Sequence, residues 1–409
     1  MLLRSLVVLY GADTLKPYKH QEELSTQALD ILRENMMVYL AMEERTGKTL
    51  TALLVAEKST AKRVLVITKK KALDGWKDTL AKFTHTKDYV VTNYHQAHKV
   101  EDDFDLVLLD ESHNYISSFP KPSSMWKKLK LLLARTPIVY ISATPYAQGL
   151  QMLFHQFQLS SWSPWRKHKN FYQWFRLYGK PYELEVAGMK IRQYDRCHED
   201  MILSVVEHLF ITKTRKELGF EHEPEDVKHY VELSKETKKL YNDLVTDELA
   251  PIGDHMLVCD TKSKLRVSLH MLEGGVAKID EEYLVLANQE KIDYVLHEFG
   301  DNSTNVIMYN YKAERTKLER HFKQSLLLQA TSYAEGVDLS NFDNLIVYSQ
   351  DFSTARHTQR RARQCNIQRK DPIRVHFMLV KGGLSEQVFK TVTINKTNFV
   401  DSVYYKETL

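Results

Sequence analysis

A series of short apolar runs constrains the first half of the chain more than any other feature. Each run is short enough to be one buried strand, and the runs read MVYLAM (37–42), RVLVIT (63–68), YVVTNY (89–94), DLVLLD (105–110) and IVYISATP (138–145). Helical spacing of apolar residues precedes the first run, at residues 24–35, and lies between later runs, at residues 49–58 and 71–83. Strands that alternate with helices predict a doubly wound α/β fold with a parallel sheet, which binds ligands at the carboxyl ends of its strands.

The turn after the first run contains part of a phosphate-binding motif. A P-loop follows the pattern G-x-x-x-x-G-K-[ST], and its glycines let backbone N–H groups close around phosphates. Residues 41–49 read AMEERTGKT, so Gly47, Lys48 and Thr49 fit the pattern, whereas Met42 stands at the first glycine. The pattern alone leaves open a working nucleotide site, a degenerate one, or a helix start that contains GKT by chance.

An acidic pair ends the fourth apolar run, where the sequence reads Asp110-Glu111-Ser112-His113. A magnesium nucleotide needs such an acid downstream of GKT. Lys48 would bind the β- and γ-phosphates, and Thr49 and Asp110 would hold the metal. Glu111 would then orient or deprotonate the attacking water. The alternative is a solvated loop end with no chemical role.

Composition sets only broad limits. The 409 residues allow two or three domains, and the net charge of +4 permits nucleic acid without arguing for it. Three scattered cysteines offer neither a disulfide framework nor zinc spacing, so we expect a reducing compartment. No apolar stretch is long enough to span a bilayer, and the N-terminal run is too short and interrupted for a signal peptide.

The motifs together resemble a known family. GKT, DESH and the SATP of residues 142–145 are similar to motifs one, two and three of superfamily-two helicases. Other segments resemble the chromatin-remodeller (Swi/Snf-type) branch, namely residues 71–83, 91–97, 143–165 and 208–244. The likeness runs from about residue 15 to residue 390. The chain looks like the compact form of such motors found in bacteriophage and prokaryotic mobile elements.

This resemblance implies an α/β fold with two tandem RecA-like lobes, each a mostly parallel sheet flanked by helices, with helical insertions. The N-terminal lobe would span residues 1–222, with a helical extension at about 150–215, and the C-terminal lobe residues 223–409. The acidic, proline-containing segment EHEPED (221–226) is our preferred boundary. Residues 246–290 show no usable pattern, and we interpret them as a helical insertion in the second lobe. Residues 391–409 are expected to pack back on a lobe as a short helix or strand.

The resemblance also assigns roles to single residues. Gln21 would read the adenine edge, and Ser142 and Thr144, with His113, would couple the nucleotide site to the nucleic-acid site. The remaining nucleotide contacts implied are Thr46, Gly47, Lys48 and Thr49 in the first lobe and Gly336 and Asp338 of motif five in the second. ATP and Mg²⁺ are the implied cofactors.

Two positions depart from the family pattern. Arg45 replaces a glycine of the phosphate loop, so we expect a loop that is re-shaped but still binds phosphate at a helix N-terminus. In motif six, Gln359 and Arg363 match, but Asn366 stands where the second arginine finger belongs. Such an arginine increases the rate about a thousandfold or more. Arg360, Arg361 or Arg369 would have to replace it; otherwise turnover is slow or absent.

The resemblance implies double-stranded or branched DNA as the partner, gripped independently of sequence. Lys69, Lys70, Thr92 and Tyr94 are the expected contacts, because they follow strand ends. Trp162, Trp165 and Trp174 are expected to pack the helical insertion rather than stack on bases. The leading hypothesis is an ATP-driven DNA translocase or helicase for fork reversal, branch migration or unwinding, in DNA replication, recombination or repair. An RNA-directed or restriction-type motor and a nucleotide-gated clamp are the alternatives.

The expected setting is the cytoplasm of a bacterial or phage-infected cell. Motors of this size in the family often work as monomers. No protein partner is indicated by the sequence.

Overall fold

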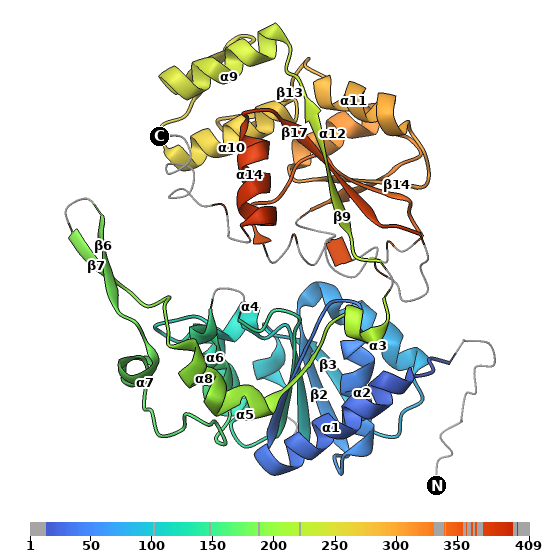
Figure 1. Ribbon diagram of the computed structural model, residues 1–409, viewed down its shortest axis with the longest axis vertical. Helices are drawn as coiled ribbons and strands as arrows, with labels where there is room; N and C mark the ends of the chain where they lie inside the picture. The colour runs from blue at the N-terminus through green and yellow to red at the C-terminus, as the bar shows by residue number, and fades with distance from the viewer. Residues whose placement is uncertain are drawn as a thin grey trace. The chain divides into compact units, whose positions relative to one another are not determined.

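The computed structural model describes residues 14–100, 103–146, 149–186, 189–220, 222–330, 339, 341–354, 357, 361–362, 365, 371–395 and 399. The chain divides into two compact units, Met1–Gly219 and Phe220–Leu409. Each unit contains one parallel sheet flanked by helices (Figure 1). The predicted α/β class with two RecA-like lobes is therefore confirmed.

The sheet of the N-terminal unit has six strands in the order β3-β2-β4-β5-β1-β8. All neighbouring strands run parallel. Their bounds are β1 Met37–Met42, β2 Arg63–Thr68, β3 Asp88–Asn93, β4 Leu106–Asp110, β5 Ile138–Ile141 and β8 Phe210–Lys213. The apolar runs of the sequence correspond to β1–β5, whereas β8 was not anticipated.

Helices bury both faces of this sheet, and side chains along a strand alternate between the two faces. Tyr39 packs on one face with α4–α8, and its neighbours Val38 and Leu40 pack on the other with α1–α3. Figure 1 shows these two groups of helices on opposite sides of the sheet. The helices of the second face are α1 Lys19–Asn35, α2 Lys48–Lys58 and α3 Leu73–Lys82, the last preceded by the 3₁₀ turn η1 Lys70–Ala72. Those of the first are α4 His113–Ile116, α5 Ser124–Leu133, α6 Leu153–Gln158, α7 Phe171–Tyr178 and α8 Glu199–Val206, with η2 Ala97–Lys99.

The segment expected as a helical extension is only partly helical. A hairpin of β6 Tyr182–Val186 and β7 Met189–Gln193 interrupts it and extends away from the rest of its unit (Figure 1). The segment opens with η3 Leu150–Met152 and closes with η4 Glu207–Leu209 before β8, which pairs with β1 at the sheet. Trp165 and Trp174 are buried in the core of the unit, in line with a packing role.

The sheet of the C-terminal unit has five parallel strands in the order β15-β14-β16-β17-β9. They are β9 Glu225–Val231, β14 Asn305–Tyr309, β15 Leu326–Gln329, β16 Asn344–Val347 and β17 Arg374–Val380. Helices α11 Glu290–Phe299 and α12 Lys312–His321 cover one face, and α14 Leu384–Phe389 packs on the other. The π-helical turn η7 Lys390–Ile394 follows α14.

Residues 246–290 form mixed structure, so the expected helical insertion is wrong. The hairpins β10 Leu249–Ile252 with β11 His255–Val258, and β12 Val276–Ile279 with β13 Glu282–Val285, flank the helix α10 Lys262–Glu273. Together with α9 Lys235–Asp247 they bury a separate apolar cluster around Leu244, Leu257 and Leu269.

Within the described residues, no helix is both long and apolar enough to cross a membrane.

Candidate nucleotide site in the N-terminal unit

Four loops meet at one edge of the N-terminal sheet. Because β1, β2, β4 and β5 are parallel and adjacent to one another or to a shared neighbour, their carboxyl ends lie at the same edge. The segments that follow these ends are 43–47, 69–70, 111–113 and 142–145, and Asp110 is the last residue of β4. Most residues that the sequence predicts for the nucleotide site of this unit come from these four segments. Lys48 and Thr49 lie in the first turn of α2, directly after the first segment, and Gln21 lies in α1.

The phosphate loop leads directly into α2. Gly47 is the N-cap of that helix with φ 83°, and Arg45 has φ 66°, both in the left-handed region. Arg45 thus adopts the conformation that a glycine would take at lower cost, so the loop keeps its turn despite the substitution. Thr46 and Lys48 lie within this turn: Thr46 Oγ1 and Lys48 Nζ each donate to the carbonyl of Glu43, both at 2.7 Å.

Lys48 is half-buried. Desolvation of its ammonium group lowers the pKa, while the nearby Glu44, Glu111 and Asp110 raise it. Three carboxylates and a backbone carbonyl therefore stabilise the positive charge of Lys48. Thr49 is the second residue of α2 and lies in its first turn, where the N–H groups and the helix dipole favour an anion.

Gln21 lies directly on the phosphate loop. Its Oε1 accepts a hydrogen bond from Tyr18 N at 2.8 Å, and its Nε2 donates to the carbonyl of Gly47 at 3.4 Å. A Cβ at Gly47 would lie 1.9 Å from that Nε2 and would displace the Gln21 side chain, and the left-handed φ of Gly47 also disfavours any other residue. Gln21 is 3% exposed and ties α1 to the loop. Its predicted contact with adenine stays a prediction.

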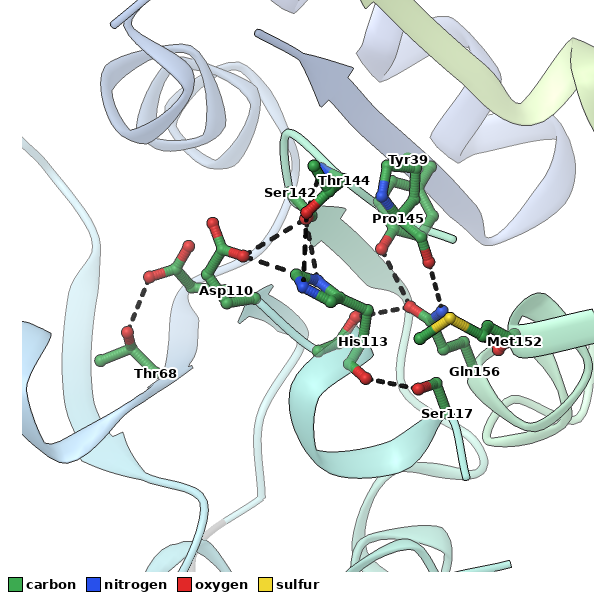
Figure 2. Close-up of polar contacts among 12 residues, drawn as sticks. Tyr39, Thr68, Asp110, His113, Ser117, Ser142, Thr144, Pro145, Met152 and Gln156 are labelled. Atoms are coloured by element: carbon green, nitrogen blue, oxygen red, sulfur yellow. Dashed lines mark hydrogen bonds and ion pairs between the residues drawn. The ribbon is translucent and has the colours of Figure 1, made fainter. Parts of the chain in front are cut away.

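Asp110 is held by two donors that the sequence did not reveal. Thr68 Oγ1 and Trp76 Nε1 both donate to its Oδ2, at 2.7 and 3.0 Å (the Thr68 contact is drawn in Figure 2). Among the described residues, no donor contacts the second oxygen, Oδ1. The carboxylate is therefore fixed in orientation by one oxygen while the other is open to a cation.

Glu111 turns the chain sharply at the end of β4, with φ 53°. A non-glycine residue in this region costs of order 1 kcal/mol or more, and such strain persists where the surroundings impose it. Its N–H donates to the carbonyl of Ile141 at 2.8 Å, which fixes the turn against β5. Burial raises the pKa of the Glu111 carboxyl to about 7, with a further rise from Asp110, while Lys69 and Lys48 act against it. A carboxyl with this pKa can accept a proton near neutral pH.

Ser142 and His113 lie next to Glu111. Ser142 Oγ is 3.3 Å from Glu111 Oε2. It is also 2.9 Å from His113 Nδ1, and it accepts a hydrogen bond from Thr144 N at 3.0 Å (Figure 2). His113 Nδ1 is itself 3.5 Å from Glu111 Oε2. Burial lowers the pKa of the His113 imidazole to about 4, so it is neutral at neutral pH. The segments after β4 and β5 therefore share one hydroxyl next to the candidate base.

Gln156 of α6 forms hydrogen bonds with the segments that follow β4 and β5, and the sequence analysis did not anticipate this role. Its Oε1 accepts from Tyr39 OH and Ser112 Oγ, both at 2.9 Å. Its Nε2 donates to the carbonyls of Pro145 and Met152, at 2.8 and 3.1 Å (Figure 2). The side chain is fully buried, with every hydrogen-bonding position used. Gln156 is one of two glutamines in the short helix α6, and the sequence does not distinguish its role from that of Gln158.

Arg215 was also missed. It follows β8, the strand that the sequence did not predict, and its guanidinium lies against Glu43 and Glu44 of the phosphate loop. Without β8 beside β1, nothing in the sequence indicates that residues this far apart are neighbours.

The residues predicted to contact nucleic acid differ in solvent exposure. Lys69 and Lys70 follow β2 at the same edge, with Lys70 exposed and Lys69 half-buried, and Thr92 lies near the end of β3. Tyr94 does not fit the expectation, because it is fully buried. Its hydroxyl donates to the carbonyl of Asp110 at 2.8 Å, and its ring stacks on Tyr115. Tyr94 thus supports the acidic strand end instead of facing a ligand.

The predictions for motifs five and six fall outside the described residues. These are Gly336, Asp338, Gln359 and Arg363, together with Asn366 and the substitute candidates Arg360 and Arg369. Arg361 is described: its Nε lies 2.8 Å from Asp226 Oδ1, and it donates to the carbonyl of Pro224. It is therefore held within its own unit.

The donor set fits magnesium. In the described part of the chain, no group of three or more His, Cys, Asp and Glu residues forms a closed metal cage. Mg²⁺ bound together with a nucleotide does not need one, because it takes one or two protein oxygens and completes its shell with phosphates and water. Asp110, with one open oxygen, and Thr49, in the first turn of α2, meet that requirement.

Comparison with known proteins adds little to this picture. No protein-family model and no curated protein matches the chain. Among solved structures, the SWI2/SNF2 ATPase core domain of Sulfolobus solfataricus aligns with 98% of this chain and 95% of its own length, at 14% identity and a TM-score of 0.42. A likeness this low carries no argument about activity. The function must be inferred from the two parallel sheets and the geometry of the site.

Proposed function

We propose that the chain is an ATP-dependent DNA translocase or helicase of the Swi/Snf-like branch of superfamily two. One observation supports this most strongly: Lys48 at the start of α2 and the Asp110–Glu111 pair at the end of β4 meet at one sheet edge, and Glu111 contacts Ser142 after β5. Motifs that lie far apart in the sequence thus form a single polar cluster.

Each residue has a defined task in this proposal. The N–H groups at the start of α2 and the Lys48 ammonium bind the phosphates, and Gln21 holds the loop in shape through Gly47. Thr49 and Asp110 hold Mg²⁺, which neutralises charge on the phosphates when it is bound. Glu111 orients the attacking water and accepts its proton, which its raised pKa permits.

Coupling to nucleic acid is proposed for the segment 142–145. Ser142 has one proton to donate and contacts both Glu111 and His113, so a shift of this segment changes the hydrogen bonding of the base. Lys69, Lys70 and Thr92 at the same edge are the proposed backbone contacts. The second unit would supply Gly336, Asp338, Gln359 and Arg363 to the same reaction.

Steady-state ATP hydrolysis tests the proposal. The rate is measured without nucleic acid and then with duplex, single-stranded and four-way-junction DNA and with duplex RNA, for the natural chain and for Asn366→Arg. Strong stimulation by duplex or junction DNA supports a DNA motor in which another arginine replaces the finger. Stimulation by RNA alone supports the RNA-directed motor. ATP-dependent DNA binding without hydrolysis, with hydrolysis gained in Asn366→Arg, supports the clamp.

A further inference from the structure

The two acids of the phosphate loop, Glu43 and Glu44, contact an arginine from the far end of the sequence of their unit. The N–H of Arg215 donates to Glu43 Oε2 at 2.7 Å, and its Nε lies 3.8 Å from the same oxygen. Its terminal nitrogen Nη1 is 3.6 Å from Glu44 Oε2 and 3.5 Å from the carbonyl of Glu44. The residue therefore contacts both acids through backbone and side chain.

The pairing of β1 with β8 creates this contact. Met42 is opposite Lys213 in the sheet, and Glu43 N donates to the carbonyl of Lys213 at 2.9 Å. The two strands are parallel, so the phosphate loop and Arg215 leave the sheet at the same edge. The side chain of Arg215 is 11% exposed and that of Glu44 is 15% exposed, so this pair is largely shielded from water.

Two carboxylates are unfavourable in a loop that must wrap a polyphosphate. Like charges repel one another, and the repulsion is stronger where water is largely excluded. Glu44 also attracts Lys48, since its charge raises the pKa of that ammonium. Without a second cation, Glu44 would compete with the phosphates for the lysine. Arg215 is placed to prevent this.

We propose that Arg215 is a positioning residue that cancels the charge of Glu43 and Glu44 and thereby makes the acidic loop able to bind a nucleotide. This inference rests on the proposed nucleotide-binding function. Arg215 also begins the 3₁₀ turn η5 Lys216–Leu218, immediately before the division between the two units at Gly219. The cation that contacts both acids of the loop thus lies in the segment that leads into the C-terminal unit.

Equilibrium binding of a fluorescent ATP analogue with Mg²⁺ to the full chain tests the inference. We expect Arg215→Ala to raise Kd about tenfold or more, a loss of about 1.4 kcal/mol or more. The double variant Arg215→Ala with Glu44→Gln should return Kd to within about threefold of the natural chain, because the uncompensated charge is gone. Glu44→Gln alone should bind as tightly as the natural chain or more tightly.

Lys213→Ala is the matched control. Lys213 is a cation two positions before Arg215, at the end of β8, but its side chain pairs with the exposed Glu217 at 3.4 Å. We expect its Kd to stay within about twofold of the natural value, since exposed ion pairs contribute little.

The outcomes separate the inference from the proposed function. An Arg215→Ala variant that melts earlier but binds the analogue unchanged would make Arg215 purely structural and overturn the inference, as would a raised Kd that Glu44→Gln does not restore. If Arg215→Ala does not fold, Glu44→Gln alone decides: weaker binding than in the natural chain overturns the inference. A natural chain that binds no nucleotide would overturn the proposed function itself.

Discussion

The Glu111 carboxylate and the Ser142 hydroxyl lie 3.3 Å apart, although 31 positions separate them in the sequence. Their strands β4 and β5 are adjacent and parallel, so the acidic pair and the SATP segment leave the sheet side by side. His113 contacts both residues and is neutral, because burial lowers the pKa of its ring. The candidate base is therefore connected to the segment proposed to sense nucleic acid.

Thr68→Val should weaken the metal site. The hydroxyl of Thr68 fixes Asp110 Oδ2, and loss of such a supporting contact lowers metal affinity about tenfold to a hundredfold. The Mg²⁺ concentration for half-maximal ATP hydrolysis should rise accordingly, while the rate at saturating Mg²⁺ changes less. Thr79→Val is the control, because Thr79 bonds only within α3, to the carbonyl of Gly75. An unchanged Mg²⁺ requirement in Thr68→Val would contradict the assignment of Asp110.

The rate should depend on pH through Glu111. Its pKa of about 7 in the free protein means that kcat/KM falls about tenfold per pH unit below neutrality, as the base becomes protonated. Lys69 is the strongest opposing charge, so Lys69→Gln should raise this pKa and move the acidic limb to higher pH. A kcat/KM that stays flat well below pH 7, or a limb that moves down in Lys69→Gln, would argue against Glu111 as the base.

Gln156→Leu should slow turnover more than it weakens nucleotide binding. The substitution leaves Tyr39, Ser112 and the carbonyl of Pro145 without a buried partner, each at a cost of about 1–3 kcal/mol. The segments after β4 and β5 then lose their shared support. We expect kcat to fall about tenfold or more, with a smaller change in the Kd for nucleotide.

Gln158→Leu is the matched control for this prediction. Gln158 lies two positions away on the same helix and donates to the carbonyls of Trp165 and His168, which belong to none of the motifs. It should lose stability but keep kcat. Equal loss of kcat in both variants would reduce Gln156 to a general packing residue.

Acid should destabilise the C-terminal unit through His229 on β9 and His376 on β17. Nε2 of His229 lies 2.9 Å from Nδ1 of His376, and burial lowers the pKa of both rings, that of His376 to about 4. Glu298 opposes the shift at His229, and Arg374 adds to it at His376. Since the folded pKa lies below the unfolded value, this stability is present above about pH 6.5 and lost as the pH falls toward 4.

For His376 alone, the loss between pH 7 and pH 5 is about 2 kcal/mol. Hydrogen exchange of the β9 and β17 amides across this range measures it. His376→Gln cannot titrate, so its protection should depend less on pH. The same pH dependence in both proteins would rule out this pair as the cause.

The sequence was informative where strands are short, apolar and buried on both faces. The predicted run 37–42 is β1, and 63–68 is β2, because continuous apolar runs between turns have few alternatives to a central parallel strand. The strand β8 was missed because FITK mixes apolar and polar residues at the edge of the sheet. Residues 246–290 were misjudged for the same reason, since the short hairpins there expose alternate side chains.

Only the site residues that belong to sequence motifs could be predicted. Lys48, Asp110, Glu111 and Ser142 could be brought to one edge by the rule that parallel strands end together. Thr68, Trp76, Gln156 and Arg215 could not, since each acts through a tertiary contact that no local pattern encodes. Tyr94 shows the opposite error: its position after a strand suggested a ligand contact, but its side chain points into the core.

The most direct test of the central claim is the rate of ATP hydrolysis with and without duplex DNA, in the natural chain and in Glu111→Gln. We predict hydrolysis that duplex DNA stimulates strongly, and its loss in Glu111→Gln while nucleotide binding is retained. A hydrolysis rate that duplex DNA does not change, or that is the same in Glu111→Gln, would contradict a DNA motor that hydrolyses ATP at this site.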